Sequence, residues 1–215
     1  AIAHHFNNQL MTVTGFIQLA LDHGLGPEVE TDLNKALEAA HKAITISTLI
    51  HSYLGLSRCQ QEAGDLAAVC RRFLPMLHTL VPDSIVLKTD LPSPGPTVAL
   101  NAKQLQQIII NLVTNGIEAM EHLQPDHTGM ITLRVGTMAA ASLVGKPRFP
   151  VNWSPKDGSY ACLEVADNGC GIAPEAMEKL FDPFYTTKFT GRGLGLPVVL
   201  GLTKAHQGAI MVESL

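Results

Sequence analysis

Three short segments in the second half of the chain, each rich in glycine or asparagine, interrupt the apolar pattern and restrict how it can fold. Residues 111–119 (NLVTNGIEA) continue an amphipathic helical pattern, 167–171 (DNGCG) directly follow an apolar run, and 191–196 (GRGLGL) precede another helical pattern. Glycines after a strand and before a helix let the backbone come close to a ligand. The order of the segments predicts a mixed α/β region with one binding site.

The first segment places two amide side chains on one side of a helix. Asn111 and Asn115 stand at i and i+4 and therefore share a face. Neutral amide oxygens at this spacing suit a Mg²⁺ ion that also takes phosphate oxygens and water. The alternative is a pair of solvent-exposed asparagines with no ligand.

The second segment follows a strand with a carboxylate and two glycines. At the end of a strand, Asp167 could accept a hydrogen bond from the amino group of adenine. Gly169 and Gly171 would let the backbone approach the base. The alternative is an ordinary Asp-Asn-Gly turn.

The third segment opens a helix with glycines. Backbone N–H groups at Gly193 and Gly195 would form an anion site at the helix N-terminus. Lys188 and Arg192 supply cations for phosphates. The alternative is a flexible loop before a helix.

The N-terminal quarter of the chain has a different pattern. Residues 1–23 predict one helix, because Phe6, Leu10, Val13 and Ile17 recur every three or four positions. A glycine- and proline-rich break precedes a second predicted helix over 28–61. One such hairpin has too little core to stand alone, whereas two copies in a dimer make a four-helix bundle.

This pattern predicts two domains, 1–62 and 63–215, joined by a linker at 62–65. In the second domain we expect helices over 67–80, 101–122 with Asn101 as the cap, 175–180 and 194–206. We expect strands over 85–91, near Val98, and over 131–138, 160–167 and 209–213, with a long connection over 139–158.

Two further segments complete a family pattern. Residues 3–8 (AHHFNN) lie at the opposite end of the chain, and 181–188 (FDPFYTTK) lie between the two glycine segments. Together, the five segments resemble the sensor histidine kinases of two-component signalling over nearly the whole chain. The resemblance implies an α+β protein, with an N-terminal helical hairpin forming a dimeric four-helix bundle, followed by an α/β sandwich with the Bergerat-type ATP-binding fold.

The same resemblance implies ligands, partners and residue roles. ATP and Mg²⁺ would be the ligands, and a second copy of the chain and a response-regulator receiver domain would be the partners. Asn115 would bind Mg²⁺, Asn111 would lie near the phosphates, Asp167 would read adenine, and 173–193 would form a lid. The remaining ATP-binding residues would be Gly169, Gly171, Lys188, Arg192, Gly193 and Gly195.

His4 is the implied phosphoacceptor. If Phe6 faces the helix seam, His4 and Asn8 point about 160° away from it, on the exposed side. A neutral imidazole is a nucleophile at pH 7 without a special base. One alternative is an exposed histidine with no role. Another is His5 as the acceptor: in the family an acidic residue usually follows the acceptor histidine, and here that position is His5.

Related ATPases such as DNA gyrase carry a glutamate four residues before the Mg²⁺-binding asparagine, where this chain has Asn111. An amide is no base at neutral pH, so the pattern favours phosphoryl transfer over hydrolysis. One alternative is a phosphotransfer or phosphatase protein with weak kinase activity, in which Asn8 orients water. Another is a non-enzymatic dimeric module with a decayed ATP site.

The bulk properties restrict the partners. A net charge of −4 and a pI near 6.1 indicate no nucleic-acid or anionic-membrane surface. The sequence has no apolar run of membrane-spanning length. Its cysteines form no CxxC pair, which is typical of reduced thiols. We expect a cytoplasmic fragment of a longer sensor that ends before the family's usual last glycine-rich strand.

Overall fold

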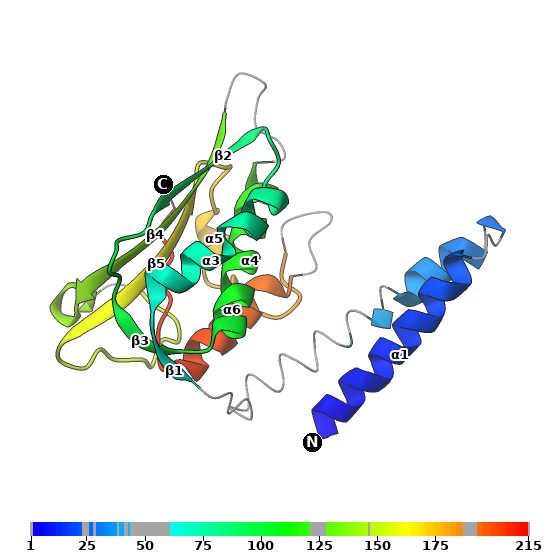
Figure 1. Ribbon diagram of the computed structural model, residues 1–215, viewed down its shortest axis with the longest axis horizontal. Coiled ribbons are helices and arrows are strands. Elements are labelled where there is room, and N and C mark those ends of the chain that lie inside the picture. The colour runs from blue at the N-terminus through cyan, green and yellow to red at the C-terminus, as the bar shows by residue number, and fades with distance from the viewer. Residues whose placement is uncertain are drawn as a thin grey trace. The chain divides into compact units, whose positions relative to one another are not determined.

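The computed structural model describes most of the predicted elements. The described residues are 2–22, 26–27, 29–37, 39–40, 43, 61–120, 128–145, 147–186 and 193–214. The chain divides into two compact units, Ala1–Arg58 and Cys59–Leu215 (Figure 1). Among the described helices, none is both long enough and apolar enough to cross a bilayer.

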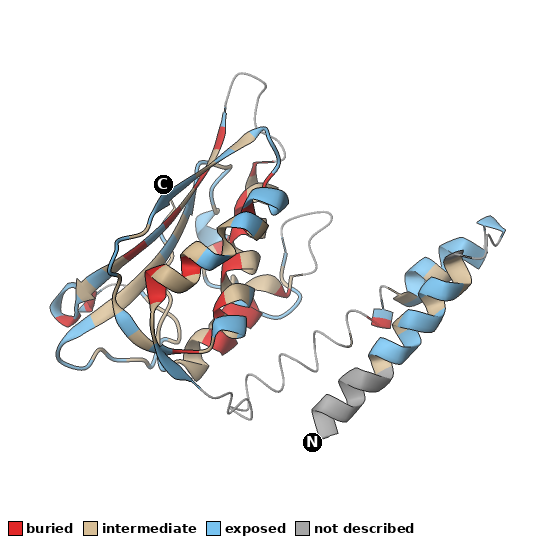
Figure 2. Ribbon diagram, in the orientation of Figure 1, coloured by how far each residue is buried: buried red, intermediate tan, exposed pale blue. Residues whose placement is uncertain are grey.

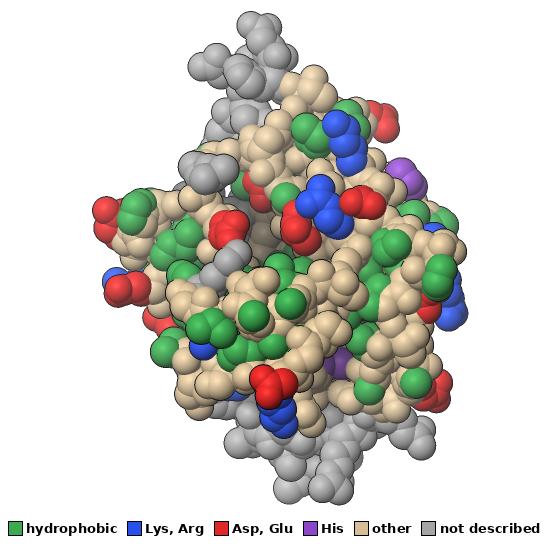
Figure 3. Space-filling model, turned by 90° about the vertical axis from the view of Figure 1, so that its left-hand side faces the viewer, with side chains coloured by type: hydrophobic (Ala, Val, Ile, Leu, Met, Phe, Trp, Pro, Cys, Tyr) green, Lys and Arg blue, Asp and Glu red, His purple; other side chains and the backbone are tan. Residues whose placement is uncertain are grey.

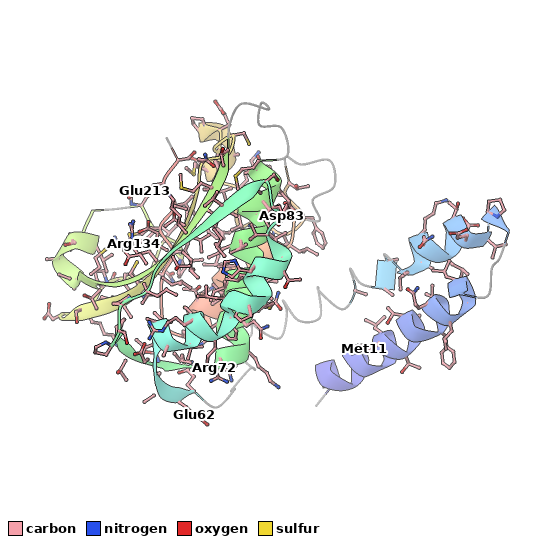
Figure 4. The ribbon with its side chains drawn as sticks, turned by 45° about the horizontal axis from the view of Figure 1, so that its top comes forward. Met11, Glu62, Arg72, Asp83, Arg134 and Glu213 are labelled. Atoms are coloured by element: carbon pink, nitrogen blue, oxygen red, sulfur yellow. The ribbon has the colours of Figure 1, made fainter. Side chains whose placement is uncertain are left out.

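The first unit begins with helix α1 (Ile2–Asp22), and residues 29–37 are also helical. Leu10 and Ile17, predicted to lie on the helix seam, are half-buried, whereas Val13 is 47% exposed in this single chain. Figure 2 shows α1 as largely exposed or intermediate where its burial is described. Met11, labelled in Figure 4, is 63% exposed and Phe16 is 69% exposed. Dimerisation through this unit remains a prediction.

The second unit contains two sheets. Strands β1 (Glu62–Asp65) and β3 (Thr97–Leu100) form an antiparallel pair. Strand β4 (Gly129–Ala139) lies between β2 (Ile85–Asp90), to which it is parallel, and β5 (Ser159–Asp167), to which it is antiparallel.

Three helices cover one face of the three-stranded sheet (Figure 1): α3 (Leu66–Leu80), α4 (Ala102–Ala119) and α6 (Gly195–Ala205). Alternate residues of β4 enter the core between sheet and helices, where they meet the apolar sides of α3 and α4. The fully buried large side chains include Leu77, Ile109, Val113, Ile131 and Leu133. Burying each of them contributes about 1.5–3 kcal/mol, which fixes α4 on the sheet.

The sheet face away from the helices carries a row of charges. Arg134 on β4, labelled in Figure 4, lies 3.1 Å from Asp90 of β2 and 3.2 Å from Glu164 of β5. These residues are direct cross-strand partners. Because all three are substantially exposed, the pairs set cross-strand geometry more than they stabilise the fold. The side seen in Figure 3 mixes hydrophobic and charged groups without one dominant sign.

Two predicted elements are wrong. Residues 62–65 are no linker, because they form β1, whose partner strand begins more than thirty residues later. Residues 209–213 form no continuous strand: Ile210 makes one isolated bridge to Phe149. The long connection over 139–158 holds a short 3-10 helix, η1 (Ala140–Leu143), and the short helix predicted near 175–180 is α5 (Pro174–Met177).

Asp65 connects the start of α3 to the chain before β3. Its carboxylate accepts the N–H of Ala68 at 2.8 Å, as an N-cap, and that of Gly95 at 2.9 Å. These hydrogen bonds, to Ala68 first and Gly95 second, hold the pKa of Asp65 below its usual value. The charged carboxylate therefore stabilises the fold at pH values above the pKa that Asp65 has in the unfolded chain.

We predict that Asp65→Asn lowers stability at neutral pH and removes part of its acid dependence. Because the pKa of Asp65 is lowered by folding, its contribution to stability is present above about pH 4 and is lost as the pH falls through the pKa of Asp65 in the folded protein. The difference in urea unfolding between the unsubstituted chain and the variant should therefore shrink below about pH 4. Asp83→Asn, in the exposed turn before β2, is the control. A difference that stays constant from pH 7 to pH 3 would contradict this role.

Candidate functional site

Helix α4 holds the two predicted amides against the first turn of α6. The helix begins at its N-cap Asn101, whose side chain accepts the N–H of Gln104, as the sequence predicts. A methyl group built on Gly195 would lie 3.6 Å from Oδ1 of both Asn111 and Asn115. The structure thus brings the first and third glycine- and asparagine-rich segments together.

The Asn111 side chain, whose Oδ1 makes this contact, also has an unsatisfied polar atom. Its Nδ2 is buried and has no hydrogen-bond partner within the described parts of the chain. A buried donor left unpaired costs about 1–3 kcal/mol. An oxygen-rich ligand between α4 and α6 would accept a hydrogen bond from this Nδ2. A solvent-exposed asparagine would not need such a ligand, because water would accept the hydrogen bond.

The N-terminus of α6 has the geometry of an anion site. Its N-cap, Leu194, makes no side-chain hydrogen bond to the first turn. Gly193 has φ +62° and lies so close to Phe184 that a methyl group there would be 2.5 Å from the Phe184 carbonyl carbon. The Phe184 N–H donates to the Gly193 carbonyl oxygen at 2.8 Å, which fixes the chain as it enters α6.

The Asp-Asn-Gly turn after β5 rests on the other end of α4. A methyl group on Gly116 would lie 3.3 Å from Cβ of Asp167, so a glycine here lets the strand end approach the helix. The Asp167 side chain is exposed, and its Oδ1 accepts the Gly169 N–H at 2.9 Å. This is the hydrogen bond expected of an ordinary Asp-Asn-Gly turn, the alternative to a ligand-binding role. It uses only Oδ1, and Oδ2 takes no part in it. Gly171 has φ +70°, which favours glycine.

Gly169 is packed even more tightly. A methyl group there would lie 2.7 Å from both Cβ and the carbonyl oxygen of Ala119, and that oxygen accepts the Cys170 N–H at 3.0 Å. Helix α4 therefore contacts both the turn after β5 and the first residue of α6.

The sequence interpretation missed the structural role of Asn168. Its Oδ1 accepts the Met130 N–H at 2.7 Å and its Nδ2 donates to the Thr128 carbonyl at 3.0 Å. These bonds attach the turn to the start of β4. An asparagine in an Asp-Asn-Gly turn was the available signal, but its distant partners could not be identified from the sequence.

Other predicted site residues lie beyond what the structure describes. Lys188 and Arg192 are outside the described residues, so their contribution of positive charge stays a prediction. His4, His5 and Asn8 belong to helix α1, but the structure does not describe their side chains. Among the described residues, no group of three or more His, Cys, Asp and Glu side chains could hold a metal ion.

Comparison with known proteins identifies the fold. The family described as "Histidine kinase-, DNA gyrase B-, and HSP90-like ATPase" matches residues 100–215, which is more than half of the chain. The chain belongs to this ATPase family. The match includes α4, the turn after β5 and the start of α6, which are the elements that form the site.

Individual relatives of this ATPase domain are sensor kinases. Sensor kinase CckA of Brucella abortus (strain 2308) is 32% identical over 99% of the chain, which spans 22% of that relative. Sensory histidine kinase/phosphatase NtrB of Vibrio alginolyticus is 28% identical over 99% of the chain, which spans 57% of it. The chain thus spans between about a fifth and three fifths of these curated relatives.

One of the solved structures is similar in fold to this chain. It is the Acinetobacter baumannii histidine kinase AdeS, with a TM-score of 0.55, 21% identity, and coverage of 94% of this chain and 86% of that one. The family match and the named relatives confirm the recognition of a histidine-kinase type of chain, and the family match confirms the ATP-binding α/β fold of the second unit.

We predict that Gly169→Ala destabilises the ATPase domain, because the methyl group would push the turn away from Ala119. Overpacking of this kind costs about 1–3 kcal/mol. Gly136→Ala in β4 is the matched control, because no heavy atom lies within 4 Å of the new methyl group. Its effect should stay within about 0.5 kcal/mol in urea unfolding. Equal losses in the two variants would show that the turn does not depend on this contact.

Proposed function

We propose that the chain is the core of a sensor histidine kinase that uses Mg·ATP. The observation that carries this proposal is the contact of Asn111 and Asn115 with the start of α6. The Asn111 side chain has a buried N–H donor with no partner among the described residues, and the helix N-terminus has no side-chain cap. Phosphate oxygens suit both kinds of donor. The sensor kinases among the relatives support the same activity.

Each segment has a proposed part in binding the nucleotide. Asn115 binds Mg²⁺ through its amide oxygen, and Asn111 together with the N–H groups near Gly193 and Gly195 binds phosphates. Lys188 and Arg192 add positive charge. Asp167 accepts the adenine amino group with its outward-facing carboxylate, and the turn with Gly169 and Gly171 lies along the base. The bound metal neutralises phosphate charge.

The proposed reaction transfers the γ-phosphoryl group to a ring nitrogen of His4. A P–N bond forms, the bond to the β-phosphate oxygen breaks, ADP leaves, and the imidazole proton passes to water. A receiver-domain aspartate then takes the phosphoryl group. Asn111 occupies the position of the glutamate that activates water in hydrolysing relatives, which favours transfer to an amino acid over transfer to water.

Phosphatase activity toward the receiver domain is a second candidate. NtrB, which carries both activities in its name, is among the relatives, and Asn8 stands one helical turn after His4, where its amide would orient a water molecule. Release of phosphate from a phosphorylated receiver domain by Asn8→Ala at the unsubstituted rate would reject this role.

The proposed active form is a homodimer. Along the predicted seam of α1, Val13 is 47% exposed, and Leu10 and Ile17 are only half-buried in the single chain. A second hairpin in a four-helix bundle would cover them. Sedimentation should therefore detect a dimer, and a fragment that stays monomeric at high micromolar concentration would contradict the bundle.

We predict that Asp167→Asn weakens binding of Mg·ATP by roughly tenfold or more, because the adenine amino group loses its charged acceptor. Asp157→Asn, an exposed carboxylate in the β4–β5 connection, is the control and should bind as the unsubstituted chain does. Calorimetric titration measures both. Equal affinities would place adenine elsewhere, whereas no binding by the unsubstituted chain would reject the ATP site.

Incubation with γ-labelled Mg·ATP tests the kinase reaction. We expect a label that is lost in acid and kept in base, as for a phosphorylated imidazole, and His4→Gln should abolish it. His78→Gln, in the last turn of α3, is the matched control and should keep it. A label that survives His4→Gln and disappears in His5→Gln would move the acceptor to His5, and no label in any variant would contradict the kinase.

A further inference from the structure

One imidazole joins the C-terminal end of α6 to the N-terminal end of α4. The Asn101 N–H donates to Nε2 of His206 at 3.3 Å, and Nδ1 of His206 lies 2.9 Å from the Leu202 carbonyl oxygen. Since Nε2 accepts a hydrogen bond, Nδ1 carries the proton and donates to Leu202. The Nδ1 atom of the ring is therefore bonded to α6, and the Nε2 atom is bonded to the N-cap of α4.

The same two helices form the phosphate end of the proposed site. Gly195, the first residue of α6, contacts Asn111 and Asn115, whereas His206 is the C-cap residue of the same helix. The helix rise places these two ends about 16 Å apart. Because a helix moves as a rigid rod over such a length, a tilt at the His206 end changes the gap at the Gly195 end.

The adenine end is built differently. Asp167 and Gly169 rest on α4 at Gly116 and Ala119, and the turn is attached to β4 by Asn168. Helix α6 takes no part in these contacts. A displacement of α6 relative to α4 should therefore affect phosphates and leave the base contacts in place.

Other hydrogen bonds hold the same end of α6 to different elements. Gln61, just before β1, donates through Nε2 to the Ala205 carbonyl at 3.2 Å, and Trp153 donates through Nε1 to the Gln207 carbonyl at 2.9 Å. These bonds attach the end of α6 to the segment before β1 and to the β4–β5 connection but not to α4, so His206 variants should still fold. His206 differs from them because its partner is the cap of the helix that carries the amides.

We propose that His206 is a positioning residue for the phosphate end of the ATP site, acting through its hydrogen bond to Asn101, the N-cap residue of α4. The inference rests on the proposed function, because it assumes that Mg·ATP binds between α4 and α6. It predicts that only the Nε2 bond matters for the nucleotide, since the Nδ1 bond stays within α6.

Two amide variants separate the two bonds. A glutamine amide reaches the position of Nε2 and can accept the Asn101 N–H, whereas an asparagine amide reaches only the position of Nδ1. His206→Asn should therefore weaken Mg·ATP binding by roughly 3- to 30-fold, and His206→Gln should stay within about threefold of the unsubstituted chain. Adenosine binding, followed by NMR titration, should stay unchanged in both variants.

Parallel losses of Mg·ATP and adenosine in His206→Asn, or equal Mg·ATP affinities in the two variants, would overturn the inference. Failure of the unsubstituted chain to bind Mg·ATP would instead reject the proposed function and the inference with it. If His206→Asn does not fold, hydrogen exchange in the unsubstituted chain decides. Mg·ATP, but not adenosine, should slow exchange of the Asn101 amide, since coupling between sites is reciprocal, and an unchanged rate would overturn the proposal.

Discussion

The packing of α4 on the sheet is the constraint on which the site depends. Ile109 and Val113 are fully buried against β4, and Asn111 and Asn115 each follow two residues later, about 200° around the helix. The apolar side and the amide side are therefore opposite faces of one rigid element. Any shift of α4 that repacked the core would also move both amides, so core packing pre-organises the polar site.

Small residues on α4 let the turn after β5 reach the same helix. Gly116 is buried beside Asp167, and Ala119 contacts Gly169 at a distance that leaves no room for a larger side chain. The segment 111–119 thus contains two amides for the proposed ligand, Asn111 and Asn115, and two small residues that allow close packing, Gly116 and Ala119. This explains why a glycine is found within a helix, where it costs up to about 1 kcal/mol in helix propensity.

Local patterns predicted much of this arrangement, whereas long-range pairing was not predictable. The cap at Asn101, the amide pair and the glycine turns depend on spacing within a few residues, and the sequence placed them correctly. The sequence predicts a linker at residues 62–65, and only their pairing with β3 makes these four residues a strand. The bonds of Asn168 to Met130 and Thr128 likewise join residues about forty positions apart.

The chemistry of the site favours positioning over activation. Within the described part of the site, the groups that face α6 are amides, and the one carboxylate, Asp167, lies at the turn on the other end of α4. An amide cannot remove a proton from water at neutral pH. A neutral imidazole, in contrast, can attack phosphorus without first losing a proton. In the proposed reaction, the rate therefore depends on how well the phosphates are aligned with an incoming histidine. That alignment is set by the gap between α4 and α6.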